Sequence, residues 1–237
     1  MGSVYLLTLR QLSGKWRLLI MTVLAALPVL ITIPTVASIR APSVQEFEVV
    51  VFSTMLAGSI LPLVVLAIAT AAFGNELEDK TLANLTLAPV PRWQIVVPKL
   101  LATITLAAPF IAVSAFVTAH IAFLDDPRAT VAVTAASVIG VALYASAFVW
   151  LGLVSHYAIG IGLLYIVVWE GFFSGFVSGV RLLSIRHYAI GWMHGLDPRR
   201  FATADQLGFG VVVVISAVVV GGFVWLAIRR LKRMDVP

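Results

Sequence analysis

Apolar residues are grouped along the chain in six long runs, separated by short polar segments. A membrane core about 30 Å thick requires roughly 20 apolar residues in a helix, and each run meets this requirement. The runs are Leu18–Ile39, Phe52–Gly74, Ile95–Leu124, Ala129–Ser155, Tyr157–Gly179 and Leu207–Ile228. The pattern predicts an all-α integral membrane protein whose residues 1–237 form a single transmembrane domain of six helices.

Two further segments, residues 1–17 and 181–206, have an amphipathic pattern. Apolar residues recur at helical spacing from Tyr5 to Trp16, while Arg10 and Arg17 occupy the other side, which predicts a helix lying in the membrane interface. The alternative is a simple extension of the first span. Residues 181–206 mix apolar residues with Arg and His. They predict one or two short amphipathic helices in the outer interface, or dipping into it, and the alternative is a structured external loop.

The distribution of basic residues predicts the orientation in the membrane. An even number of spans places both termini on one side, and that side would hold ten of the sixteen Lys and Arg residues. Basic residues are more frequent in cytoplasmic connections, so both termini are expected in the cytoplasm. The protein is expected in the plasma membrane of a prokaryotic cell. The ten residues are Arg10, Lys15, Arg17, Lys80, Arg92, Lys99, Arg229, Arg230, Lys232 and Arg233.

Composition excludes several classes of protein. Hydrophobic residues make up 61% of the chain and charged residues 11%, against about a quarter charged in soluble domains. The chain has no cysteine, which excludes disulfides, thiolate metal sites and a cysteine nucleophile. The net charge of +5 is explained by topology and contact with anionic lipid, so no nucleic-acid partner is expected.

Enzyme signatures were sought and not found. The sequence has no H-E-x-x-H, G-x-S-x-G or phosphate-loop motif, so no catalytic, cofactor-binding or metal-binding residues are assigned. His187 and His194 are seven residues apart, but a histidine pair without a third ligand is a weak metal site. If the protein uses ATP, the ATP and its magnesium must bind to a separate ATPase subunit.

The segment 75–94 is the most distinctive polar stretch. Glu76 and two further acidic residues precede a helix-like stretch, Thr81–Leu87, which should end before Pro89 because proline disfavours the helical conformation in the residue before it. Arg92 then marks the return of the chain to the membrane. A short charged helix of this kind would fit the groove of a soluble partner, and the alternative is a solvated loop.

The chain resembles a permease subunit of the type-2 export class of ABC transporters over nearly its whole length. The resemblance is carried by "LRQL" (Leu9–Leu12), "NELEDKTLANL…PVPRWQIVVPK" (Asn75–Lys99), "YIVVWEG" (Tyr165–Gly171) and "LSIRHY" (Leu183–Tyr188). In such permeases a glycine commonly precedes the threonine of the loop, and this chain has Lys80 there.

The resemblance implies a function and a set of partners. The 75–94 loop would form the coupling helix that docks on nucleotide-binding ATPase subunits, and a second permease subunit, identical or related, would complete the translocation path as a dimer. The ATPase-coupling positions carried over are Glu76, Thr81, Leu85, Pro89, Arg92 and Lys99.

The fifth apolar run contains a carboxylate, Glu170, followed by two stripes on a helical wheel. The polar stripe, within about 80° at 100° per residue, consists of Glu170, Ser174, Ser178 and Arg181. The glycine stripe consists of Gly171, Gly175 and Gly179, a spacing that allows two helix backbones to approach closely.

We expect the glycine stripe to pack against a neighbouring helix and to hold the polar stripe inward, because an ionised residue at the centre of a span costs about 2.5–3.5 kcal/mol. Glu170 would then be a structural hydrogen-bond or ion-pair partner. Two alternatives stay open, a substrate-facing or proton-sensing role and exposure to lipid.

The pattern favours the membrane half of an ATP-driven exporter. The alternative is a secondary transporter or channel that uses Glu170 as an ion or proton site. That class usually has further intramembrane ionisable residues and paired broken helices, which are not evident in this sequence. An intramembrane enzyme would require a nucleophile–base pair or a metal motif. The transported substrate is not indicated by the sequence.

Overall fold

The computed structural model describes residues 2–37, 43–78, 91–124, 126–173, 183–201 and 207–233. Within these ranges every regular element is a helix. Five helices are long and apolar enough to cross a membrane: Lys15–Val36, Phe47–Gly74, Trp93–Ala122, Pro127–Val154 and Phe209–Arg233. The protein is therefore an all-helical, multi-pass membrane protein.

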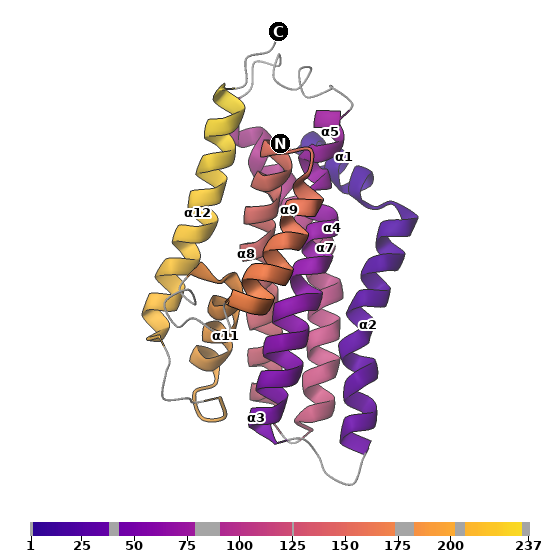
Figure 1. Cartoon of the computed structure of the whole chain (residues 1–237), viewed down its shortest axis with the longest axis vertical. Coiled ribbons are helices and arrows are strands. Elements are labelled where there is room, and N and C mark those ends of the chain that lie inside the picture. The colour runs from indigo at the N-terminus through magenta and orange to yellow at the C-terminus, as the bar shows by residue number, and fades with distance from the viewer. Residues whose placement is uncertain are drawn as a thin grey trace.

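The helices run up and down in an elongated bundle, with the N-terminal helix and the end of the last helix at the same end (Figure 1). In chain order they are α1 (Gly2–Leu12), α2 (Lys15–Ala37), α3 (Val44–Glu46), the π-helix η1 (Phe47–Ile60), α4 (Leu61–Ala69), α5 (Ala71–Glu78), α7 (Trp93–Ala122), α8 (Pro127–Val154), α9 (Ala158–Leu164), the π-helix η2 (Tyr165–Phe173), α11 (Ile185–Leu196) and α12 (Phe209–Arg233).

The N-terminal amphipathic segment forms a helix of its own. α1 ends at Leu12 and α2 begins at Lys15, so the first span does not simply extend to the N-terminus. α1 buries Thr8 and Leu12 and packs on α7. Its predicted position in the membrane interface stays a prediction.

The prediction of six full spans is not confirmed. The fifth run, Tyr157–Gly179, forms an apolar helix over Ala158–Phe172 that is shorter than the other five, and residues 174–182 lie outside the described ranges. At about 1.5 Å per residue this described helix covers about 22 Å, less than the hydrocarbon core. In Figure 1 the orange ribbon of α9 and η2 starts near the end of the bundle that carries α5 and stops about midway, and α11 occupies the other half.

α8 is the central element of the bundle. It contacts α4, α5, α7, α9, α11, α12 and η1. Asp126 caps its N-terminus by accepting hydrogen bonds from the backbone amides of Arg128 (3.1 Å) and Ala129 (3.3 Å), and Pro127 supplies a first helical residue without a free N–H. Small residues let neighbouring helices approach α8 closely. At Gly152, an added Cβ would lie 2.5 Å from the backbone oxygen of Thr70, at the junction of α4 and α5.

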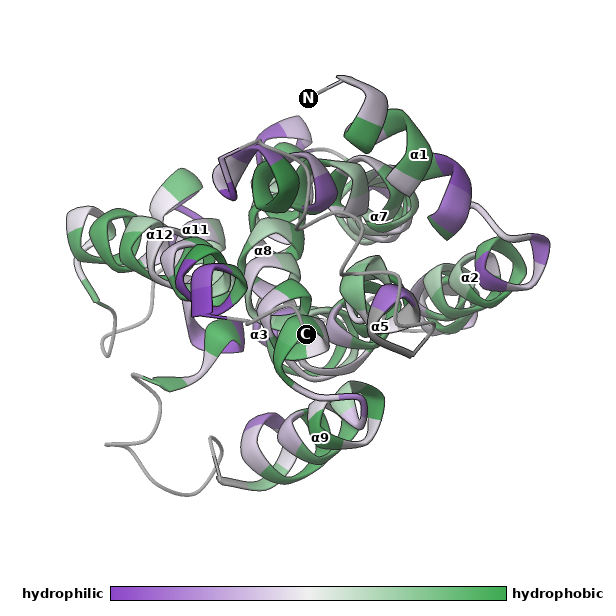
Figure 2. Ribbon diagram, turned by 90° about the horizontal axis from the view of Figure 1, so that it is seen from above, coloured by the Kyte–Doolittle hydropathy of each residue, from purple (hydrophilic) through white to green (hydrophobic). Residues whose placement is uncertain are grey.

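The outer faces of the bundle are apolar. Seen along its axis, the peripheral helices α2, α9 and α12 are largely green, the colour of hydrophobic residues (Figure 2). Leu30 on α2, Leu164 on α9 and Val218 on α12 each leave more than half of their surface exposed. Such faces are suited to contact with lipid, because lipid tails are as apolar as these side chains and burial inside the protein adds no hydrophobic free energy.

Candidate functional site

Two of the predicted coupling residues, Glu76 and Lys99, form an ion pair. Glu76 lies in the last turn of α5 and Lys99 in the second turn of α7, and the lysine Nζ is 2.6 Å from the glutamate Oε1. The Lys99 side chain is only 1% exposed, whereas that of Glu76 is 14% exposed. The pair joins the two helices that flank residues 79–90, so the ends of that loop are held together.

The ammonium group of Lys99 has two further partners in α5. It donates a hydrogen bond to the Ala72 carbonyl, and it lies 4.6 Å from the centroid of the Phe73 ring. A buried ammonium needs such compensation because its desolvation costs several kcal/mol. Sequence reasoning identified Lys99 as a basic residue near the cytoplasmic side, but the signal for its burial was only its place inside an apolar run.

Two polar atoms beside this ion pair have no hydrogen-bond partner. Glu76 Oε2 and Arg92 Nη1 are both buried, and neither makes a hydrogen bond within the described part of the chain. Arg92 directly precedes α7. A buried polar atom without a partner costs about 1–3 kcal/mol.

Thr81, Leu85 and Pro89 lie within residues 79–90, outside the described ranges, so the helix predicted there stays a prediction.

The second candidate feature is Glu170 of η2, which is fully buried. Its Oε1 accepts hydrogen bonds from the hydroxyls of Tyr144 on α8 (3.1 Å) and Tyr165 on η2 (2.8 Å), and its Oε2 accepts one from Ser184 (2.5 Å). The carboxylate therefore faces the interior of the bundle. Exposure to lipid, one of the alternatives from the sequence, does not occur in this structure.

The same carboxylate lies at the N-terminus of α11. The backbone amides of Ile185 and Arg186, the first two of the helix, donate to Glu170 Oε1 at 3.0 and 3.4 Å. Ser184 is the N-cap, and its hydroxyl also accepts from the His187 amide at 3.3 Å. The first amides of a helix lack intrahelical acceptors and carry a partial positive charge. A carboxylate from another helix accepts their hydrogen bonds and balances that charge.

Glu170 thus joins three elements, η2, α8 and α11. Sequence reasoning singled out Glu170 but missed Tyr144, Tyr165 and Ser184. The hydroxyls on Tyr144 and Tyr165 carried no periodic signal, whereas "LS" before an apolar, helix-like stretch is a weak N-cap signal that could have indicated Ser184.

The two stripes of the fifth run are described only at their beginnings. Ser174, Ser178, Arg181, Gly175 and Gly179 lie within residues 174–182, outside the described ranges.

Gly171 is described, and it does not fulfil the predicted packing role within this chain. It is exposed, and a Cβ added there would meet only the Ile166 carbonyl of its own helix, at 3.5 Å. In the described part of this run, the close approach is instead at Gly162, where a Cβ would overlap the Leu66 side chain of α4. Glu170 faces inward, as expected from the sequence. Gly171, the next residue on the helical wheel, points in a different direction and faces outward.

At the opposite end of the bundle, two ion pairs join segments far apart in sequence. His194 of α11 lies 2.5 Å from Glu48 of η1, so the histidine considered as a weak metal ligand has a carboxylate partner instead. Arg200 lies 2.8 Å from Asp126, and its hydrogen bond holds the pKa of that carboxyl below its ordinary value. Within the described ranges no group of three His, Cys, Asp or Glu residues could hold a metal ion.

Comparison with known proteins agrees with the architecture. No curated protein matches the chain. A family model described as "ABC-2 family transporter protein" matches residues 9–185, from α1 to the first residue of α11, which is more than half of the chain. The match includes the Glu76–Lys99 pair and Glu170. The chain therefore belongs to the ABC-2 family of transporter membrane proteins and is an ABC-2 type permease.

Proposed function

We propose that this chain is the transmembrane permease subunit of an ATP-driven exporter. Two copies, or this chain and a related one, form the translocation path as a dimer, and separate ATPase subunits supply the energy. The proposal is supported by membership in a permease family and by a sequence without a phosphate loop. Both termini lie in the cytoplasm of a prokaryotic cell under this proposal.

The Glu76–Lys99 ion pair is the observation that carries the coupling part of the proposal. A loop can transmit force from a soluble partner to the membrane only if its ends are attached to the spans that must move. Lys99 attaches the end of α5 to α7 through an ion pair, a carbonyl and an aromatic ring, on either side of residues 79–90.

The alternative, in which Glu170 is an ion or proton site, receives less support from the geometry. A transported ion needs a carboxylate with free acceptor capacity and an aqueous path. Glu170 already accepts from three hydroxyls and two helix amides and is fully buried. This is the environment of a structural carboxylate.

Coupling is tested with Glu76→Gln, Lys99→Gln and the double variant, each co-expressed with the proposed cognate ATPase subunit. We expect each single change to leave a buried group unmatched and to reduce complex yield or substrate-stimulated ATP hydrolysis several-fold. The double variant should lose less than the sum of the two losses, because the residues interact directly.

Lys232→Gln is the matched control, because it removes one exposed positive charge at the same end of the bundle, outside the pair. It should retain normal yield and hydrolysis. Full activity of both single variants in a stable complex would contradict the role of the pair, and ATP hydrolysis by the homogeneous permease alone would contradict the proposed division of labour.

A further inference from the structure

Three arginines line a crevice between the C-terminal ends of α8 and α12. The crevice encloses about 430 Å³ and is lined by Arg229, Arg230 and Arg233 of α12 together with Trp150, Val154 and Leu226. Arg229 lies 5.0 Å from the Trp225 ring, which holds its guanidinium at the surface. None of the three arginines makes a salt bridge with a described carboxylate. Within the part of the chain that the structure describes, the crevice is therefore a concentrated positive site without acidic partners, and it has an apolar floor.

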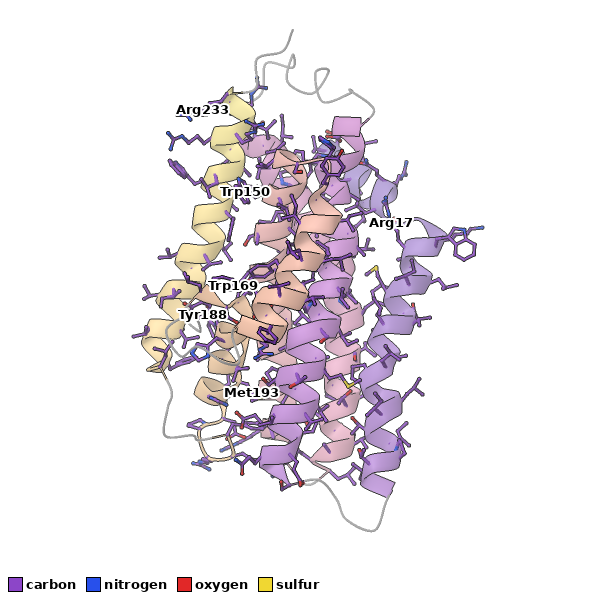
Figure 3. All side chains as sticks on the ribbon, viewed as in Figure 1. Arg17, Trp150, Trp169, Tyr188, Met193 and Arg233 are labelled. Carbon is purple, nitrogen blue, oxygen red and sulfur yellow. The ribbon has the colours of Figure 1, made fainter. Side chains whose placement is uncertain are left out.

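A second, apolar cavity shares Trp150 with this crevice and lies among α8, α12, α11 and the α9–η2 helix. It encloses about 490 Å³, and Trp150 lines both spaces. On α12 its lining residues Phe223, Val219 and Ile215 lie about two, three and four turns before Arg229. Figure 3 shows this order, with Arg233 near the end of α12, Trp150 below it and Tyr188 of α11 lower still.

The two spaces together suit an amphiphile. Guanidinium groups bind phosphate oxygens through paired hydrogen bonds, and basic pockets between transmembrane helices bind anionic lipid headgroups. The apolar cavity below would take a hydrocarbon chain, and its volume lies in the range of about 300–1,000 Å³ that is typical of small-molecule sites. A soluble anion would use only the first space.

We propose that the α8–α12 crevice binds an anionic phospholipid, with the phosphate at Arg229, Arg230 and Arg233 and one acyl chain in the cavity below Trp150. The lipid comes from the leaflet at the end of the bundle that carries both termini (Figure 1). The site is independent of the proposed coupling to an ATPase, because none of its residues belongs to the 75–94 loop or to the Glu76–Lys99 pair.

The test is native mass spectrometry of the full-length chain in detergent, titrated with phosphatidylglycerol and with phosphatidylcholine of the same acyl chains. Phosphatidylglycerol should bind more tightly. Each arginine near a headgroup contributes about fivefold in affinity, so the triple variant R229Q/R230Q/R233Q should bind it on the order of a hundredfold more weakly. The control R10Q/K15Q/R17Q removes as many charges from the same end of the bundle and should bind normally. An equal loss in both triple variants would overturn the site, because surface charge alone would then explain binding.

A second variant, Val219→Trp, tests the acyl-chain cavity and leaves every charge in place. It should weaken binding of phosphatidylglycerol at least severalfold by filling the cavity, while helix content and elution volume stay unchanged. Unchanged binding would overturn the proposed position of the chain. Glycerol 3-phosphate, offered as a competitor at millimolar concentration, should not displace the lipid. Full displacement would show a site for free phosphate esters and overturn the lipid assignment.

Discussion

Replacing Glu170 with leucine should destabilise the protein more than any other single change in η2. The variant leaves five donors without their acceptor: three hydroxyls and the two backbone amides at the start of α11. The hydroxyls can rotate toward other acceptors, but the amides are fixed by the helix. At about 1–3 kcal/mol for each unsatisfied amide, the loss is about 2–6 kcal/mol.

Glu170→Gln should cost much less. The amide oxygen still accepts from the two α11 amides, and the Ser184 hydroxyl can accept from the new NH₂ group. What is lost is the interaction of a charge with a helix N-terminus, about 1–2 kcal/mol in a buried position. If Glu170 is structural, this variant should also transport nearly normally. A well-folded Gln variant without transport, or without its pH dependence, would show that Glu170 handles charge.

Thermal unfolding of the purified chain in detergent measures both effects. A loss of 2–6 kcal/mol corresponds to a decrease in Tm of roughly 4–24 °C for a chain of this size. Val167→Leu is the matched control, since Val167 lies in the same helix with 66% of its surface exposed. A Glu170→Leu variant that unfolds within about 1 °C of the wild type would refute the capping role of the carboxylate.

Three further predictions concern other parts of the molecule. Single cysteines at Asn84 and Thr203 should be labelled from opposite sides of the membrane; labelling of both from one side would contradict the proposed topology. The pKa of Asp126 is lowered in the folded state, chiefly by the hydrogen bond from Arg200. The ionised carboxylate therefore stabilises the fold at pH values above its ordinary pKa, and this stabilisation is lost as the pH falls through the folded-state pKa. Asp126→Asn should therefore reduce stability at pH 7 by about 0.2–1 kcal/mol and by less near pH 3, and an equal loss at both values would contradict this linkage. Gly152→Ala should cost about 1–3 kcal/mol because its Cβ would lie 2.5 Å from a backbone oxygen, whereas Gly160→Ala, where the Cβ meets open space, should cost nothing; equal stability of the two variants would contradict the close contact.

The spans were predictable because each depends on a local property, the length of an apolar run. The same rule is not confirmed for the fifth span, of which the structure describes only the first part. Hydropathy in this region does not fall until Arg181, so the run seemed long enough to cross, whereas the apolar helix identified in the structure covers Ala158–Phe172. Hydropathy reports where residues are apolar, but not where a helix ends and its partner begins.

The sequence was enough to identify individual residues of the candidate sites, but not the residues that they contact. A carboxylate within an apolar run must be compensated, and this indicated Glu170 from the sequence alone. Its partners depend on how α8, η2 and α11 pack, and no periodicity encodes that. Similarly, Glu76 and Lys99 were identified separately, while their pairing requires α5 and α7 to lie side by side across 23 residues of chain.

The position of Glu170 relative to α11 has a consequence for biosynthesis. Its amide donors follow it by only 15 and 16 residues, so they leave the ribosome about 1–3 seconds later at 5–20 residues per second. Tyr144, on the preceding span, is synthesised earlier still. The carboxylate therefore enters the translocon with two partners, Tyr144 and Tyr165, already synthesised and the others close behind. The segment from α9 to α11 is expected to insert as one hairpin, in a single step that never exposes the acidic group alone to lipid.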